Sequence, residues 1–277
     1  PSMWAYNAGN MALRTNHLER AVTRFLAADP DSPCNVDWKP WWTQLASTYH
    51  LLGRYEDELD LARRGLARYP AYFGLLDVET RALAALGRVE EVDSLLDLVA
   101  GLPPAQGYVP GLRPLWAALE LRVHGHPEAA QRATDRALAW FAGLPSDTLR
   151  YQRGRGFFYA GRLEDADTLF AALQREAPGN LLYLGFHGVT LARLHRREEA
   201  RKLDERLAAW DEPAELGSAN EFRAQIAAAL GERDEAVRLL QAAFDHGAYY
   251  GVPLHLEPAF EGMKGYPPWE ALVAPRP

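Results

Sequence analysis

The amino-acid sequence predicts an all-α fold in which helical hairpins repeat along the chain, and three observations lead to this prediction. Alanine, leucine, arginine and glutamate dominate the sequence, and strand signals are scarce. Glycine or proline interrupts the helical pattern at intervals. A similar motif also returns every 34 to 38 residues. A nearly constant period of this size is typical of repeat proteins.

The repeated motif contains a turn residue, then a polar or acidic pair, and then a small or apolar residue five positions after the turn. The copies GRLEDADTLF at Gly161 and GERDEAVRLL at Gly231 show this pattern clearly. The residues at the last position are Ala21, Glu58, Val92, Ala130, Ala166, Ala200 and Ala236. Seven copies indicate seven hairpins, each with two helices that approach closely at the small residue. Glu58 departs from this pattern, which argues against close packing in its hairpin.

The turn residue of each copy is expected to end the first helix in a left-handed conformation, which satisfies the last carbonyl groups of that helix. Glycine adopts this conformation most readily, and Asn16 and His195 replace it in two copies. The acidic residues that follow favour the N-terminus of the second helix through its dipole. Because pairs such as Glu164–Asp165 recur at one repeat position, we interpret them as helix-start residues and not as catalytic acids and bases.

Residues outside the turn motif complete a known repeat pattern. They are Trp42, Leu45, Ala46 and Tyr49 in the second copy, Gly9, Ala21, Phe25, Ala28 and Pro33 in the first, and Gly154, Phe157, Ala166, Phe170 and Pro178 in the fifth. In these residues the chain resembles tetratricopeptide repeat (TPR) proteins, whose pattern is W-x2-L-G-x2-Y followed by Ala, Phe, Ala and Pro at fixed offsets. The resemblance extends roughly over residues 2–250 and implies a right-handed α-solenoid of about seven hairpins.

The copies divide the chain into seven expected hairpins and a final segment. The hairpins cover residues 2–37, 38–72, 73–110, 111–146, 147–180, 181–216 and 217–250, within a superhelix over residues 1–250. Residues 251–277 contain the stretches LHLEPAF and PPWEALV. In these stretches they are similar to a tail that follows TPR arrays in large bacterial proteins, including ones with an N-terminal kinase or transcription-factor domain. We expect this tail to form a short helix that covers the apolar end of the array. The covering side chains are expected to be Phe260, Trp269, Leu272 and Val273.

The resemblance also implies a binding face on the first helix of each hairpin, because these helices line the concave side of a TPR superhelix. The residues on this face include aromatic rings, amides and arginines. Aromatic rings can contact the side chains of an extended peptide, amides can pair with its backbone, and arginines can bind its carboxylates. The residues that the family pattern places on this face include Tyr6, Asn7, Asn10, Arg14, Thr43, Gln44, Ser47, His50, Arg81, Trp116, Arg122, Tyr151, Gln152, Arg155, Tyr159 and Phe222.

One known TPR ligand is not expected here. Some TPR proteins hold the C-terminal carboxylate of a chaperone with two lysines, two asparagines and an arginine. Asn10 matches one of these positions. The other positions hold Tyr6, Gln44, Gly74 and Val78, so we do not expect chaperone-tail binding.

These features favour a non-enzymatic interaction module that binds a peptide or protein segment in the concave groove. The resemblance suggests that the module is the sensing or scaffolding part of a larger bacterial regulatory protein involved in signalling. The alternative is an autoregulatory or dimerising array that packs on its own effector domain, without an external peptide. A free inner face favours peptide binding, whereas a groove filled by the C-terminal segment favours the alternative.

Composition and motifs argue against other classes of partner. The net charge is -7 and the sequence pI is about 5.7, so nucleic acid is not expected as the main partner. No apolar stretch reaches the roughly 18 residues that span a bilayer, so no membrane partner is expected. No metal, nucleotide or hydrolase motif is present, so we expect no catalysis, no cofactor and no metal. His124 and His126 are expected to be surface turn residues.

The single cysteine and the first residue suggest where the chain belongs. Cys34 has no second cysteine to pair with, which fits a reducing, cytoplasmic compartment. The chain begins with Pro1 and not with methionine, so we expect it to be part of a longer protein.

Three tryptophans in the stretch WKPWW raise the alternative of an aromatic ligand platform. Trp42 occupies the tryptophan position of the TPR pattern, so we expect it to point into its own hairpin. Trp41 lies one step round the same helix and is expected to face the neighbouring repeat. Trp38 precedes the helix and either packs against its start or lies exposed near the groove.

Overall fold

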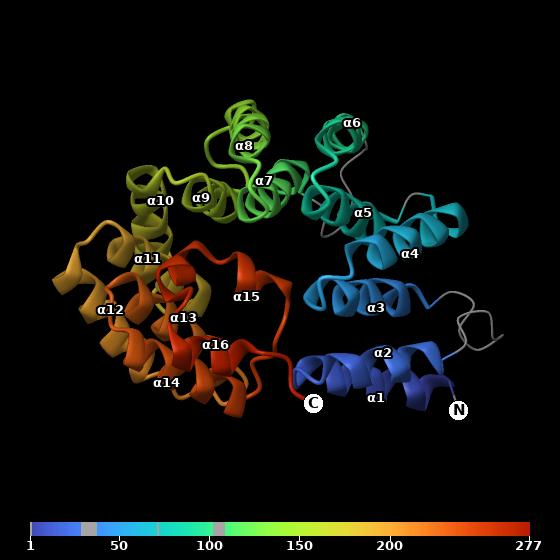
Figure 1. Cartoon of the computed structure of the whole chain (residues 1–277). Helices are drawn as coiled ribbons and strands as arrows, with labels where there is room; N and C mark the ends of the chain where they lie inside the picture. Colours follow the sequence, from blue (N-terminus) through green and yellow to red (C-terminus); the bar gives the residue numbers. More distant parts are fainter. Residues whose placement is uncertain (1, 29–37, 71, 102–108) are drawn as a thin grey trace. The chain divides into compact units, whose positions relative to one another are not determined.

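The computed structural model describes residues 2–28, 38–70, 72–101 and 109–277, and every regular element in these ranges is helical (Figure 1). Pro33 and Cys34 lie outside the described residues. The helices form consecutive antiparallel pairs, which confirms the predicted all-α fold of TPR-like hairpins. The exact repeat boundaries and the hand of a superhelix stay predictions.

The described helices comprise seven pairs and a final group of short elements. The pairs are α1 Ser2–Arg14 with α2 Leu18–Leu26, α3 Lys39–Leu51 with α4 Tyr55–Arg68, α5 Phe73–Ala85 with α6 Val89–Ala100, α7 Arg113–Val123 with α8 Pro127–Ala142, α9 Arg150–Tyr159 with α10 Leu163–Glu176, α11 Leu181–Arg193 with α12 Arg197–Ala208, and α13 Leu216–Ala229 with α14 Arg233–Asp245. The short elements are η1 Pro110–Leu112, α15 Val252–Leu256, η2 Pro258–Met263 and α16 Pro267–Val273.

The hairpin turns have the left-handed backbone that the sequence predicts, including the two turns without glycine. Asn16 has a φ of 63° and His195 a φ of 59°. At the first turn, the backbone N–H of His17 donates to the Ala12 carbonyl at 2.8 Å and that of Asn16 donates to Leu13 at 3.0 Å. This pair of hydrogen bonds satisfies the last carbonyl groups of α1. The left-handed turn therefore ends the first helix even where a side chain opposes it.

The residue five positions after each turn is buried in every copy, as a close helix–helix approach requires. Ala21, Ala166, Ala200 and Ala236 have no exposed surface. Glu58 is also fully buried, although it is charged. Packing in its hairpin is therefore retained, and the expectation of looser packing there is wrong. The partners of Glu58 that make this possible belong to the candidate site.

The WKPWW stretch is mainly part of the core. Trp41 Nε1 donates to the Phe25 carbonyl on α2 at 2.8 Å, so this ring does reach the preceding hairpin. Trp42 is buried and lies edge-on to Tyr69 after α4, inside its own hairpin. Trp38 is 36% exposed and packs edge-on against Tyr6, with ring centroids 5.5 Å apart. No shared aromatic platform results, because two of the three indoles are inside the fold.

Contacts among the described residues divide the chain into two compact units. Unit 1 contains residues up to 137, residues 250–256 and residues 275–277. Unit 2 contains residues 138–249 and 257–274. In unit 1, α15 packs against α3 and α7. In unit 2, η2 packs against α13 and α16 packs against α14.

The C-terminal segment contributes buried aromatic residues to unit 2. Phe260 and Trp269 are buried, with ring centroids 4.7 Å apart, and Val273 is buried with them. They lie on η2 and α16, which pack against α13 and α14. Leu272 is half-buried, and a capping role for this segment stays a prediction. In the described part of the chain, no helix is both long enough and apolar enough to cross a membrane.

An alanine at Gly185 is expected to destabilise unit 2 by roughly 1–3 kcal/mol, because its Cβ would lie 2.3 Å from the Phe222 ring on the neighbouring helix. Helix propensity alone predicts the opposite sign, since alanine favours a helix interior more than glycine does. Urea unfolding followed by circular dichroism measures the difference. Gly179→Ala is the control, because no atom lies within 4 Å of its added Cβ. Equal unfolding midpoints for the two variants would contradict this packing.

Candidate functional site

The first helices of the hairpins carry two clusters of polar and aromatic side chains, one in each unit. The cluster of unit 1 lies on α3, α5 and α7 and includes the N-terminal part of α4. The cluster of unit 2 lies on α9, α11 and α13. Both clusters contain residues that the sequence predicts for the binding face.

The unit 1 cluster is built around two buried carboxylates. His50 on α3 lies between them, with Nδ1 2.7 Å from Glu58 Oε2 and Nε2 3.3 Å from Glu120 Oε1. Arg81 on α5 donates from Nε to Glu58 Oε1 at 2.8 Å and also from Nη2 to the same oxygen. The carboxylates are no more than 2% exposed. Buried charges at such sites are costly unless they are paired, and these partners provide the pairing.

The charge balance of this cluster favours a protonated His50. Two carboxylates face one arginine, so the second positive charge must come from an imidazole. Burial lowers the pKa of His50, but its contacts with Glu120 and Glu58 outweigh burial and raise the pKa above 6.5. His124 Nε2 lies 3.6 Å from Glu120 Oε2, and the Tyr55 ring packs against both histidines at 5.1 Å. The cluster thus joins helices of three consecutive hairpins.

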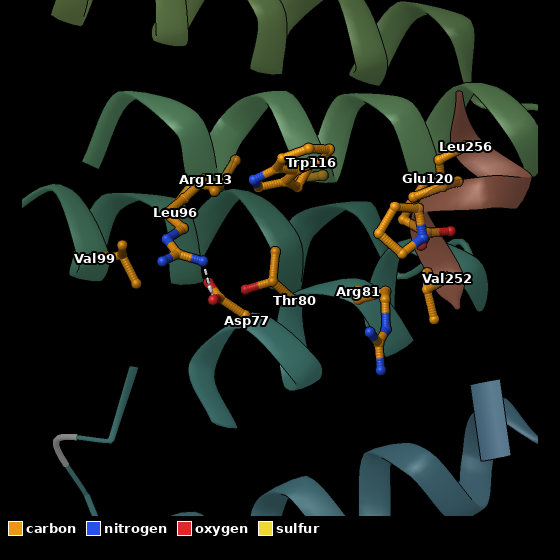
Figure 2. Close-up of a pocket in the computed structure, with 12 residues that line it drawn as sticks. Asp77, Thr80, Arg81, Leu96, Val99, Arg113, Trp116, Glu120, Val252 and Leu256 are labelled. Atoms are coloured by element: carbon orange, nitrogen blue, oxygen red, sulfur yellow. Dashed lines mark hydrogen bonds and ion pairs between the residues drawn. The ribbon is translucent and has the colours of Figure 1, made fainter. Parts of the chain in front are cut away.

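A pocket of about 200 Å³ lies beside this network, between α5 and α7 (Figure 2). An ion pair between Asp77 and Arg113 lies at one side, and α15 forms the wall at the other side. The lining residues are Asp77, Thr80, Arg81, Leu96, Val99, Arg113, Trp116, Ala117, Glu120, Val252, Pro253 and Leu256.

The space in this pocket is mainly bounded by apolar groups. Its charged residues already face opposite charges, since Asp77 pairs with Arg113 and Arg81 pairs with Glu58. The buried Glu120 carboxylate lies 3.3 Å from His50 and 3.6 Å from His124, without a hydrogen bond to either. The Thr80 hydroxyl donates to the Leu76 carbonyl at 2.7 Å. The pocket therefore suits an apolar group better than a charged one, since a charged group would have to break an existing pair.

The unit 2 cluster is an arginine surrounded by aromatic rings. The guanidinium carbon of Arg155 lies 5.8 Å from the Tyr151 ring centroid, 5.9 Å from Tyr159 and 5.7 Å from Phe186. Phe222 on α13 packs edge-on against Phe186 at 5.4 Å. Such contacts stabilise a cation by roughly 0.5–2 kcal/mol each. They also occupy the faces of the rings that a ligand would otherwise meet.

A residue of the C-terminal segment enters the unit 2 cluster. The Tyr159 hydroxyl donates to Glu257 Oε2 at 3.4 Å, and the Ala259 N–H donates to Oε1 at 3.2 Å. Burial raises the pKa of Glu257 to about 7, against the backbone hydrogen bond from Ala259. Burial also raises the pKa of the nearby Glu221 carboxyl. The C-terminal segment therefore contacts a first helix in unit 2, as α15 does in unit 1.

The predicted contact residues differ widely in exposure. Tyr6, His50, Tyr159 and Phe222 are buried, and Asn7, Arg14 and Arg122 are exposed. The half-buried residues are Asn10, Thr43, Gln44, Ser47, Arg81, Trp116, Tyr151, Gln152 and Arg155. The fold brings Arg81 and Trp116 together at the pocket, with Ser47 Oγ 3.5 Å from Arg81 Nη2. It also brings Tyr151, Arg155, Tyr159 and Phe222 together around Phe186. Ligand contact by any of them stays a prediction.

Sequence reasoning missed the acidic members of both clusters. The sequence does mark Glu58 as unusual, since it is a charged residue at a repeat position that is otherwise small or apolar. Glu120 and Glu257 had no such signal, because His50 and Tyr159, which face them, lie far away in sequence. In the described part of the chain, no group of three or more His, Cys, Asp or Glu side chains is placed to hold a metal ion.

Comparisons with known proteins find similarity among solved structures alone. No family model matches the chain, and no curated protein matches it. Among solved structures, the chain is similar to a tetratricopeptide repeat protein from Parabacteroides merdae ATCC 43184, with 15% sequence identity and a TM-score of 0.46. The similarity covers 94% of this chain and 98% of the other chain. The fold class itself rests on the helix pairs of this chain.

The stability of unit 1 is expected to fall as pH rises above about 6.5. The pKa of His50 is higher in the folded state, so its contribution is complete below about pH 6.5 and is lost as pH rises through the folded pKa. His50→Gln should flatten this dependence. Urea unfolding at several pH values measures it, and His246→Gln, an exposed histidine in unit 2, is the control. An unchanged pH dependence in His50→Gln would show that this group does not control it.

The stability of unit 2 is also expected to depend on pH, through the carboxyl group of Glu257. Its carboxyl pKa is raised from 4.5 to about 7, so its contribution is complete below about pH 4.5 and is lost as pH rises through about 7. Glu257→Gln keeps the polar shape without the charge and should reduce the loss of stability. Hydrogen exchange of η2 at acidic and neutral pH reports the effect. Glu261→Gln, at an exposed position on the same element, should behave as the unaltered chain does.

Proposed function

We propose that this chain is a non-enzymatic interaction module that binds a segment of a partner protein on the first helices of unit 1. The observation that carries the proposal is the pocket between α5 and α7, which contains two of the predicted contact residues, Arg81 and Trp116. In this proposal the partner inserts an apolar side chain beside Trp116. The resemblance to TPR arrays supports a place in a larger bacterial regulatory protein.

The chemistry of the pocket supports an apolar anchor. Leu96, Val99 and Trp116 contribute apolar walls, and the neighbouring charges are held in ion pairs. Burial of one leucine-sized or phenylalanine-sized side chain stabilises a complex by roughly 1.5–3 kcal/mol. Anchors of this kind dominate the energetics of many interfaces, because they fill a desolvated pocket near the centre.

Polar residues on α3 supply the remaining contacts in this proposal. Thr43, Gln44 and Ser47 lie half-buried on α3, on the same set of first helices. Hydroxyl and amide groups can pair with the backbone of a bound segment without sequence preference. The apolar anchor would then determine affinity, and the polar groups would determine register.

One observation favours the alternative, an autoregulatory array. The C-terminal segment lies on first helices in each unit, through α15 on α3 and α7 and through Glu257 on α9. A filled inner face is what such an array requires. We place peptide binding first because the pocket beside α15 has space for a further side chain.

Trp116→Ala is expected to weaken peptide binding by about tenfold or more, which corresponds to about 1.4 kcal/mol. The probe is a library of short random peptides displayed on phage and selected on the full chain. Selected peptides should share an apolar residue, and titration with synthetic copies measures affinity. Trp4→Ala is the matched control, because Trp4 is 67% exposed on α1 and away from the pocket residues. Equal affinity for a folded Trp116→Ala variant would reject this site.

A further inference from the structure

We infer that α15 is a built-in occupant of the unit 1 site, and that the partner is a short helical segment with two apolar side chains four residues apart. This inference rests on the proposed function and names the class of partner. It follows from how α15 is placed, from the space beside it, and from the short length of the helix.

The placement of α15 shows what kind of segment the site accepts. Val252 and Leu256 are four residues apart and therefore lie on one face of the helix. Both are buried, and both line the pocket between α5 and α7. Pro253 lies in the first turn, where proline does not break a helix. The chain thus places the apolar side of its own helix α15 against the proposed binding site.

The pocket is larger than α15 needs. About 200 Å³ of space extends from the α15 wall toward Trp116 and Val99 (Figure 2). A partner helix that has one further apolar residue, a turn away from the pair, could fill this space as well as the positions of Val252 and Leu256. Such a segment would bury apolar surface that α15 leaves open, so it could compete with the tethered segment.

Hydrogen bonds outside the pocket add to the buried contacts of α15. The Tyr250 N–H donates to the Arg14 carbonyl at 3.4 Å, and the Arg276 N–H donates to the Asn16 carbonyl at 2.7 Å. Arg276 Nη2 also donates to the Tyr250 hydroxyl at 3.3 Å. These contacts hold Tyr250, just before α15, and Arg276, near the C-terminus, at the turn between α1 and α2. A helix of five residues has little stability by itself, so its fold depends on docking.

A competition experiment tests this inference on the full chain. The probe is a fluorescein-labelled peptide with the sequence of residues 249–257, YYGVPLHLE. The proteins are the unaltered chain and the double variant V252S/L256S, both checked for folding by circular dichroism. A tethered segment competes at a high effective concentration, so the peptide should bind the double variant at least about tenfold more tightly than the unaltered chain.

Matched controls show whether the apolar pair is what binds. A peptide that carries V252S and L256S should lose binding to the double variant. Equal binding of the normal peptide to both proteins, or no binding to the double variant, would overturn the inference. The phage-selected peptides test the proposed function separately, since they need not resemble α15.

A second measurement does not depend on how the double variant folds. Hydrogen exchange at residues 250–256 of the unaltered chain is followed with and without an excess of the labelled peptide. Displacement predicts faster exchange at these residues when the peptide is present, because α15 loses its docking surface. Unchanged exchange under excess peptide would identify α15 as a permanent part of unit 1 and would overturn the inference.

Discussion

The burial of Glu58 inside its hairpin is the constraint on which unit 1 depends. A carboxylate at that depth must be paired, so Arg81 and His50 are committed to it and the helices that carry them are fixed relative to α4. Removing one partner would leave an uncompensated charge, which typically costs about 3–5 kcal/mol. The position of α5 beside α3, and with it one side of the pocket, therefore follows from a single acidic residue.

This constraint also determines which chemistry the inner face can offer. An arginine held by a buried carboxylate is poorly placed to leave it for a ligand, because the carboxylate would lose its partner. Arg155 is similarly enclosed by three aromatic rings in unit 2. Residue types that look like binding groups in the sequence thus act largely as internal structure. What remains for recognition in unit 1 is apolar space and a few half-buried hydroxyl and amide groups.

Much of the fold could be predicted from local pattern, because each hairpin repeats the same short-range rules. The left-handed turns at Asn16 and His195, the inward direction of Trp42 and the acidic helix starts all depend on residues within one repeat. The site could be predicted only in part. The pairing of Glu120 with His50 joins helices from different hairpins, and the docking of α15 involves a segment outside the period. Neither relation is visible in residue spacing.

The contact between His50 and Glu120 has a consequence for how unit 1 unfolds. In most repeat arrays each hairpin contacts only its immediate neighbours, so stability is nearly a sum of nearest-neighbour terms and the ends can fray independently. Here His50 belongs to the second hairpin and Glu120 to the fourth, so the contact passes over the hairpin between them. Loss of any one of these three hairpins would remove a charged partner from at least one of the groups that remain. The second to fourth hairpins should therefore behave as one cooperative block, in contrast to the stepwise melting of a simple linear array.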